Sequence, residues 1–228
     1  PYAFTSLEFL NRLHLPKGPV YGCMIDAKTV LSRGGDHSKS IDELFKSKVD
    51  EKIGLVRVAA HFDEVASCRE MLGRLKIKGY MVGLNIMQSS LRDSVDLEKK
   101  ALLITSWKCV DVLYFADSLG SMTDIDVERV YNAIRKGWNG DIGFHAHNNM
   151  GQGVSNVKVA INLGCTWVDG TVSGMGRGAG NSETEYLLED TKICKSTDLG
   201  SIFSLVVNFF DPLKRTYGWG ASIPYYLG

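Results

Sequence analysis

Two histidines one residue apart follow an apolar run in the segment Gly143-Phe-His-Ala-His-Asn-Asn. Side chains at positions i and i+2 of a β-strand point to the same side, so His145 and His147 should face one point. Neutral imidazole is a common metal ligand, and two such rings could bind one divalent cation. The spacing therefore predicts a metal site, although two histidines alone do not complete a coordination sphere.

Six short apolar segments have the length and the β-branched content of buried parallel strands. They lie at 20–25, 53–59, 80–86, 110–116, 141–145 and 165–172. Amphipathic helical patterns occur at about 5–13, 40–51, 63–76, 93–107, 123–136, 151–163, 182–195 and 199–210. Residue pairs typical of capping boxes predict three helix starts, at Ser40 with Glu43, Thr123 with Asp126, and Ser182 with Glu185. Strands that alternate with helices in this way indicate repeated βα units.

Such alternation fits either an open doubly wound sheet or a (β/α)₈ barrel. A doubly wound nucleotide-binding sheet should have a glycine-rich turn after its first strand, where this chain offers only Gly22. Polar residues instead follow the late strands: Asp117, Ser118, His145, His147 and Asp169. Their convergence requires a closed sheet, so we expect an α/β fold of the TIM (β/α)₈-barrel type with about six βα units visible.

The composition favours a small-molecule partner. Lys plus Arg and Asp plus Glu both total 26, so no net charge favours nucleic acid or an anionic membrane. The five cysteines are scattered, which is typical of buried thiols in a reducing cytoplasm. We find neither a long apolar membrane span nor a secretory leader, and we expect a cytoplasmic protein with no membrane partner.

Four segments together carry a resemblance to a known family. They are the run from Gly143, Gly164-Cys-Thr-Trp-Val-Asp-Gly-Thr-Val-Ser-Gly-Met-Gly-Arg-Gly-Ala-Gly-Asn, Phe115-Ala-Asp-Ser-Leu-Gly-Ser-Met-Thr, and Val56-Arg-Val-Ala-Ala-His. In this order and spacing they resemble the metal-dependent lyase and aldolase superfamily that includes 4-hydroxy-2-oxovalerate aldolase, isopropylmalate synthase and 3-hydroxy-3-methylglutaryl-coenzyme A lyase. The resemblance spans most of residues 53–190.

The resemblance implies roles for particular residues. His145 and His147 would be the two histidine ligands of one divalent cation, Mg²⁺ or Mn²⁺ in preference to Zn²⁺. Asn181 matches an asparagine that binds the metal in some members only. Ser118 falls where the aldolase branch has a serine near the pyruvate carboxylate.

The chain departs from the family at its start. The family's first strand carries an Asp-x-x-Leu-Arg-Asp-Gly signature that supplies a metal carboxylate and an arginine, and no such run occurs here. If residues 141–145 correspond to the family's strand seven, counting backward makes residues 20–25 strand three. Because the family's arginine and aspartate of strand one are absent, no residue of this chain is assigned as catalytic. We expect strands one and two to lie upstream in the same polypeptide, in another chain, or to be lost, with the first favoured. Residues 1–212 would form a partial barrel, and 213–228 an aromatic C-terminal extension.

The implied activity is that of a divalent-metal-dependent aldolase, which cleaves or forms a carbon–carbon bond next to a pyruvate-type 2-oxo acid through a stabilised enolate. Its partners would be a 2-oxo acid, an aldehyde and further copies of the chain in a homo-oligomer. Protons compete with a metal for imidazole, so activity should fall in acid. Three alternatives remain: a non-catalytic barrel subunit that binds a 2-oxo acid or a protein, an acyl-coenzyme A condensing synthase, and a zinc hydrolase.

Other residues have two interpretations each. Arg57 either contacts substrate or pairs with a strand carboxylate. Asp117 and Asp169 either support the metal ligands from behind or hold loops. Asp26 could replace the absent metal carboxylate. The glycine-rich loop 174–180, with Arg177, precedes a helix and could receive a substrate carboxylate, or it is an ordinary solvated loop.

Overall fold

One parallel sheet organises the chain, for which a computed structural model describes residues 7–48, 52–191 and 198–221. Its strands follow one another across the sheet in chain order: β1 (Gly22–Asp26), β2 (Leu55–His61), β3 (Met81–Met87), β4 (Val112–Asp117), β5 (Asp141–Ala146) and β6 (Trp167–Val168). Sequential parallel order is that of a (β/α)₈ barrel, whereas a doubly wound sheet reverses its order at a switch point. The expected fold class is thus confirmed, with β1 and β6 as edges of an open sheet among the described residues.

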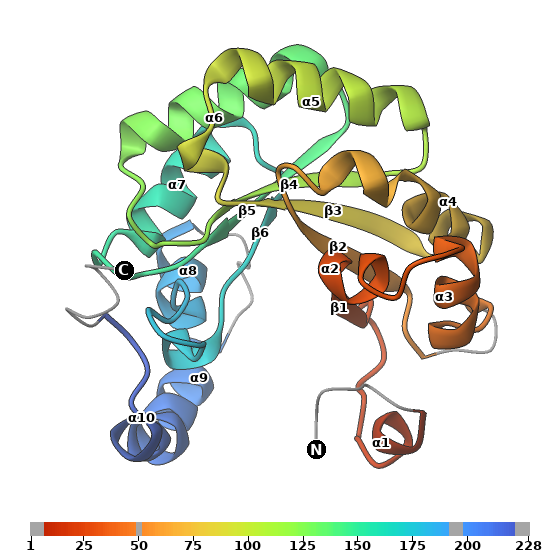
Figure 1. The fold of residues 1–228 in the computed structure, drawn as a ribbon. Helices are drawn as coiled ribbons and strands as arrows, with labels where there is room; N and C mark the ends of the chain where they lie inside the picture. The colour runs from red at the N-terminus through yellow and green to blue at the C-terminus, as the bar shows by residue number, and fades with distance from the viewer. Residues whose placement is uncertain (1–6, 49–51, 192–197, 222–228) are drawn as a thin grey trace.

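Helices connect the strands and cover the outer face of the sheet. The α-helices are α1 (Leu7–Asn11), α2 (Ala27–Leu31), α3 (His37–Leu44), α4 (Arg69–Ile77), α5 (Ser94–Trp107), α6 (Asp124–Gly137), α7 (Gly153–Leu163), α8 (Thr184–Thr191), α9 (Leu199–Leu205) and α10 (Asp211–Tyr217). Short helical turns are η2 (Val65–Cys68), η3 (Ser89–Leu91), η4 (Val172–Gly174) and η5 (Val206–Phe210), the last of π type. In Figure 1 helices α4 to α7 arch over the outer side of the curved sheet, and α8 to α10 extend from its β6 end. No helix in the described ranges has the length and apolar character needed to cross a membrane.

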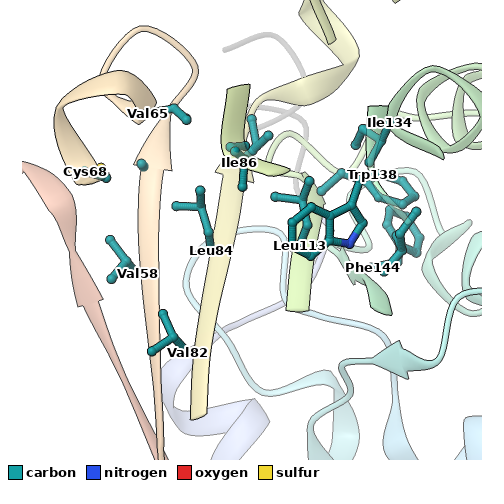
Figure 2. Packing of buried hydrophobic residues seen from close by; sticks show 14 of the residues in the cluster. Val58, Val65, Cys68, Val82, Leu84, Ile86, Leu113, Ile134, Trp138 and Phe144 are labelled. Carbon is teal, nitrogen blue, oxygen red and sulfur yellow. The ribbon is translucent and has the colours of Figure 1, made fainter. Parts of the chain in front are cut away.

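The main core lies between the outer face of the sheet and these helices. Alternate strand residues point outward, and Figure 2 shows Val58, Leu84 and Leu113 of successive strands in this layer, with Trp138 beside Leu113. Phe115 and Phe144 stack with ring centroids 4.6 Å apart. A fully buried side chain of this size contributes about 1.5–3 kcal/mol, so this layer fixes which strand residues face the opposite, inner side.

One local expectation about a helix start is confirmed, and others are wrong. Thr123 and Asp126 form the expected capping box of α6. The start predicted at Ser40 is wrong, because Asp36 caps α3 by accepting from the N–H groups of Ser38 and Lys39. The sequence also missed α2 and overestimated the last strand, since β6 has only two residues. Parts of the predicted helices 5–13, 40–51 and 182–195, and of the aromatic extension, lie outside the described residues.

The start predicted at Ser182 is wrong as well. Helix α8 begins at Thr184, and the Glu185 carboxylate accepts from the N–H of Ser173 instead of capping its own helix.

Candidate metal centre

The inner face of the sheet carries the polar side chains that the sequence singled out. In the register of the strands, Arg57 lies beside Gly83, Tyr114 beside Gly143, and Ala116 beside His145. Residues in register on parallel strands share one face, so Arg57, Tyr114 and His145 all point inward. The carboxyl end of this face is where barrel proteins place their sites.

A glycine makes room for Tyr114 on this face. A Cβ atom at position 143 would lie 2.6 Å from Cζ of the Tyr114 ring and closer to two further ring carbons, so no larger residue fits unless the ring moves. The ring in turn supports the Arg57 guanidinium, whose Cζ lies 4.5 Å from the ring centroid. This geometry permits a cation–π interaction and directs Arg57 across the inner face.

The Asp169 carboxylate joins Arg57 to the first histidine. Its Oδ2 atom lies 2.6 Å from Nη1 of Arg57 and 2.7 Å from Nδ1 of His145. Burial raises the pKa of Asp169, but the hydrogen bond from His145 and the charge of Arg57 outweigh burial and hold this pKa below its ordinary value. The ionised carboxylate only accepts hydrogen bonds, so Nδ1 of His145 carries a proton, and Nε2 is the nitrogen with which the neutral ring would bind a metal.

The second histidine has an equivalent arrangement. Nδ1 of His147 lies 2.8 Å from the carbonyl oxygen of Gly180, which can only accept. Nδ1 is therefore protonated, and Nε2 of His147 is also available. Burial lowers the pKa of His147, and the nearby His145 lowers it further, so His147 is neutral at pH 7. The two ring centroids lie 5.0 Å apart with their planes at 88°.

Asn181 is brought next to this pair. It forms an isolated antiparallel bridge with His147, and its Nδ2 donates to the carbonyl of Met175 over 3.0 Å. A Cβ at Gly176 would collide with the same amide group, so the glycine allows the loop to close on Asn181. The Oδ1 atom of Asn181 is buried and has no hydrogen-bond partner. It is one of four buried side-chain atoms without a partner in the described ranges, and as an acceptor beside His147 it has a lone pair that a water or a cation can use.

The other sequence candidates occupy different positions. Ser118 lies at the end of β4, where its Oγ accepts from the N–H of Gln88 and keeps its own proton to donate. The Asp117 carboxylate lies on the outer side, in register with Ala146, and accepts from two N–H groups of its own loop; burial outweighs these bonds and raises its pKa.

Asp26 does not join the histidines. Its carboxylate caps helix α2 by accepting from the N–H of Lys28, so it does not replace the absent metal carboxylate. Across the three ranges of the chain with described positions, no group of three or more His, Cys, Asp or Glu residues could hold a metal. The available donors are two imidazole nitrogens and one amide oxygen. They fit a divalent cation as a partial ligand set.

Sequence reasoning missed three contributors to this centre. The Tyr114 ring contacts the Arg57 guanidinium, and the Gly180 carbonyl lies within hydrogen-bond distance of His147. The Trp219 indole donates to the carbonyl of Ser173, at the start of the loop that leads to Asn181. Backbone carbonyls carry no sequence signal. The inward position of Tyr114 could have been inferred, because it lies two residues before Ala116, which aligns with His145.

The order of the strands and the histidine pair at a strand's carboxyl end define a partial (β/α)₈-barrel protein with its polar site on the expected face. Comparison with known proteins then places the chain more narrowly. It belongs to the HMGL-like family, whose model matches residues 43–206. This match confirms the resemblance found in the sequence motifs.

Curated relatives include proteins named 4-hydroxy-2-oxovalerate aldolase. One from Rhodococcus opacus (strain B4) is 36% identical over 148 residues, which is 65% of this chain and 42% of the relative. Another, from Geobacillus genomosp. 3, is 34% identical over 174 residues, 75% of this chain and 51% of the relative. The chain thus spans about half the length of the curated relatives that it matches.

Solved structures agree on the fold. The N-terminal domain of a protein from Bacteroides vulgatus, described as a candidate aldolase, superposes with a TM-score of 0.78 at 26% identity and covers 91% of this chain and 67% of that one. The HMG-CoA lyase from Brucella melitensis gives a TM-score of 0.70 at 14% identity, covering 91% of this chain and 78% of the lyase. The second likeness concerns the fold alone.

Proposed function

We propose that this chain provides the metal-binding part of an aldolase that cleaves or forms a carbon–carbon bond next to a pyruvate-type 2-oxo acid. The observation that carries the proposal is the pair of imidazoles, each with Nδ1 bonded to an acceptor and Nε2 free. The curated relatives named 4-hydroxy-2-oxovalerate aldolase support the reaction class. The acceptor aldehyde stays open.

His145, His147 and the Oδ1 atom of Asn181 would hold the cation, Mg²⁺ or Mn²⁺. When bound there, a divalent cation supplies electrophilic stabilisation of negative charge that develops on the keto oxygen of the substrate. Asp169 and the Gly180 carbonyl hold the two rings in the tautomer that ligation requires. The two histidine contacts are already formed in the metal-free protein, so no free energy is needed to orient the rings when a cation binds.

The remaining groups would orient the substrate. The Arg57 guanidinium bonds Asp169 through Nη1 and contacts Tyr114, and its side chain is 17% exposed on the inner face. Its guanidinium therefore has further N–H donors for a carboxylate. Ser118, directly after strand β4, can donate its hydroxyl proton. We propose that these two residues bind the carboxylate of the 2-oxo acid.

The test combines cation binding with proton exchange. Mn²⁺ binding is measured by electron paramagnetic resonance, and loss of pyruvate methyl protons in heavy water is followed by NMR. We expect the unaltered protein to bind Mn²⁺ and to exchange the methyl protons. His147→Gln should weaken Mn²⁺ binding at least tenfold, since it removes a direct ligand. His14→Gln, which changes an exposed histidine outside the site, is the matched control and should leave binding unchanged.

The outcomes distinguish the proposed aldolase from a non-catalytic metal-binding subunit. Mn²⁺ binding without proton exchange would favour the non-catalytic subunit, which the incomplete ligand set among the described residues also supports. An equal Mn²⁺ affinity in His147→Gln and His14→Gln would overturn the metal site itself. The condensing synthase is a weaker alternative, because none of the relatives reported above carries that name.

A further inference from the structure

Ser173 has a backbone conformation that its residue type rarely adopts. Its φ of 54° and ψ of 27° lie in the left-handed region, and its side chain is buried. A residue with a Cβ atom pays about 1–2 kcal/mol for this conformation. Surrounding contacts must therefore hold Ser173 in place.

Both backbone polar groups of Ser173 are bonded to side chains from other elements. Its N–H lies 3.1 and 3.0 Å from the two carboxylate oxygens of Glu185, a buried residue of α8. Its carbonyl accepts from the indole Nε1 of Trp219 over 2.9 Å. Glu185, from the helix that follows the loop, and Trp219, from the segment after α10, thus hold the two peptide units on either side of the Ser173 Cα atom.

Ser173 begins the loop that reaches the histidine pair. Directly after it, the carbonyl of Gly174 accepts from the N–H of Asn181 over 3.0 Å. The loop also delivers the Gly180 carbonyl to Nδ1 of His147. Beside Trp219, the N–H of Gly220 donates to the Gly178 carbonyl over 3.0 Å, which adds a second attachment between the C-terminal segment and the loop.

We propose that Trp219 and Glu185 are positioning residues that clamp Ser173 in its left-handed conformation and so hold Asn181 and the Gly180 carbonyl against the histidine pair. The segment after α10 therefore belongs functionally to the site, although it is distant in sequence. The consequence for cation binding rests on the proposed function. The clamp itself concerns the loop backbone and is testable without metal.

Hydrogen exchange of backbone amides in metal-free protein tests the clamp. Trp219→Phe keeps an aromatic ring but removes the N–H donor, so exchange at the Asn181 amide should accelerate about 5–10-fold, the factor for one net hydrogen bond. Trp138→Phe is the matched control, because Trp138 also donates its indole N–H to a carbonyl, that of Asp141, but outside the loop. It should leave exchange at Asn181 unchanged.

A second substitution tests the role of the strained residue. Glycine adopts the left-handed region freely, so Ser173→Gly should slow exchange of the loop, and the double variant Ser173→Gly with Trp219→Phe should return toward the unaltered rate. Unchanged exchange at Asn181 in Trp219→Phe would overturn the clamp. Equal acceleration by Trp138→Phe, or no rescue by Ser173→Gly, would overturn it as well.

The effect on the site is measured separately. Trp219→Phe should weaken Mn²⁺ binding by about the same 5–10-fold, with the unaltered affinity partly restored in the double variant. If the unaltered protein bound no Mn²⁺, the proposed function would fail while the exchange data still decided the clamp. If Mn²⁺ affinity stayed constant while the loop loosened, the clamp would not position the ligands.

Discussion

Substitution of Gly143 by alanine should be far more costly than its size suggests. The added Cβ would lie 2.6 Å from one carbon of the Tyr114 ring and closer to two others, whereas ordinary contacts are 3.4–4 Å. The overlap is about 1 Å against a rigid ring that is 3% exposed and lies beneath Arg57. Overpacking of this kind costs about 1–3 kcal/mol. It outweighs the roughly 0.5–1 kcal/mol that alanine gains over glycine in a strand interior.

Urea unfolding of a double-mutant cycle measures this cost. Gly143→Ala is compared in the unaltered protein and in Tyr114→Ala, in which the ring is absent and alanine at 143 should be neutral or slightly stabilising. We expect a coupling free energy of about 2 kcal/mol. Gly73→Ala is the control: a Cβ there meets nothing within 4 Å, so it should stabilise α4 by about 1 kcal/mol. An equal cost of Gly143→Ala in both backgrounds would refute the reasoning.

Two further predictions concern charged groups. Asp169→Asn should weaken Mn²⁺ binding about 10–100-fold, because His145 loses the carboxylate that holds its tautomer. Calorimetric titration with Mn²⁺ measures this loss, and an unchanged Mn²⁺ affinity would contradict the prediction. Hydrogen bonds from Arg74 and then Lys78 lower the pKa of Asp42 from 3.8 to about 2. Since the folded-state pKa lies below the unfolded one, the stabilisation is complete above about pH 4 and is lost as the pH falls through 2. The urea midpoint should therefore drop less between pH 5 and pH 2 in Asp42→Asn than in the unaltered protein, and parallel drops would count against this pairing.

The sequence predicts the sheet well because burial on both faces produces continuous apolar runs. β4 is the clearest case, with all six residues buried, and its position matches the expected strand within two residues. The capping box at Thr123 is also local, so its sequence signal is sufficient. The last strand fails because the chain leaves the sheet after Val168, and Val172, which completes the predicted run, lies in the helical turn η4 instead.

The site is only partly predictable. The histidine spacing correctly indicated side chains on a common face, and pairing of Arg57 with a strand-end carboxylate was one of two open interpretations. The partner, Asp169, is 112 positions away and is set by the register of several strands, which no local pattern encodes. Glu185 shows the same limit, since its spacing from Ser182 suggested a cap while its carboxylate bonds Ser173.

The sequential order of the strands also bears on how the molecule assembles. Every described strand pairs only with the strands nearest to it in the chain, so each βα unit can add to the one before it without waiting for a distant segment. Ordering a short connection costs less loop-closure entropy than joining remote ends, and local connectivity speeds folding. Growth by single units would expose a fresh strand edge at every stage, and at high concentration that transient edge is where self-association during refolding should begin.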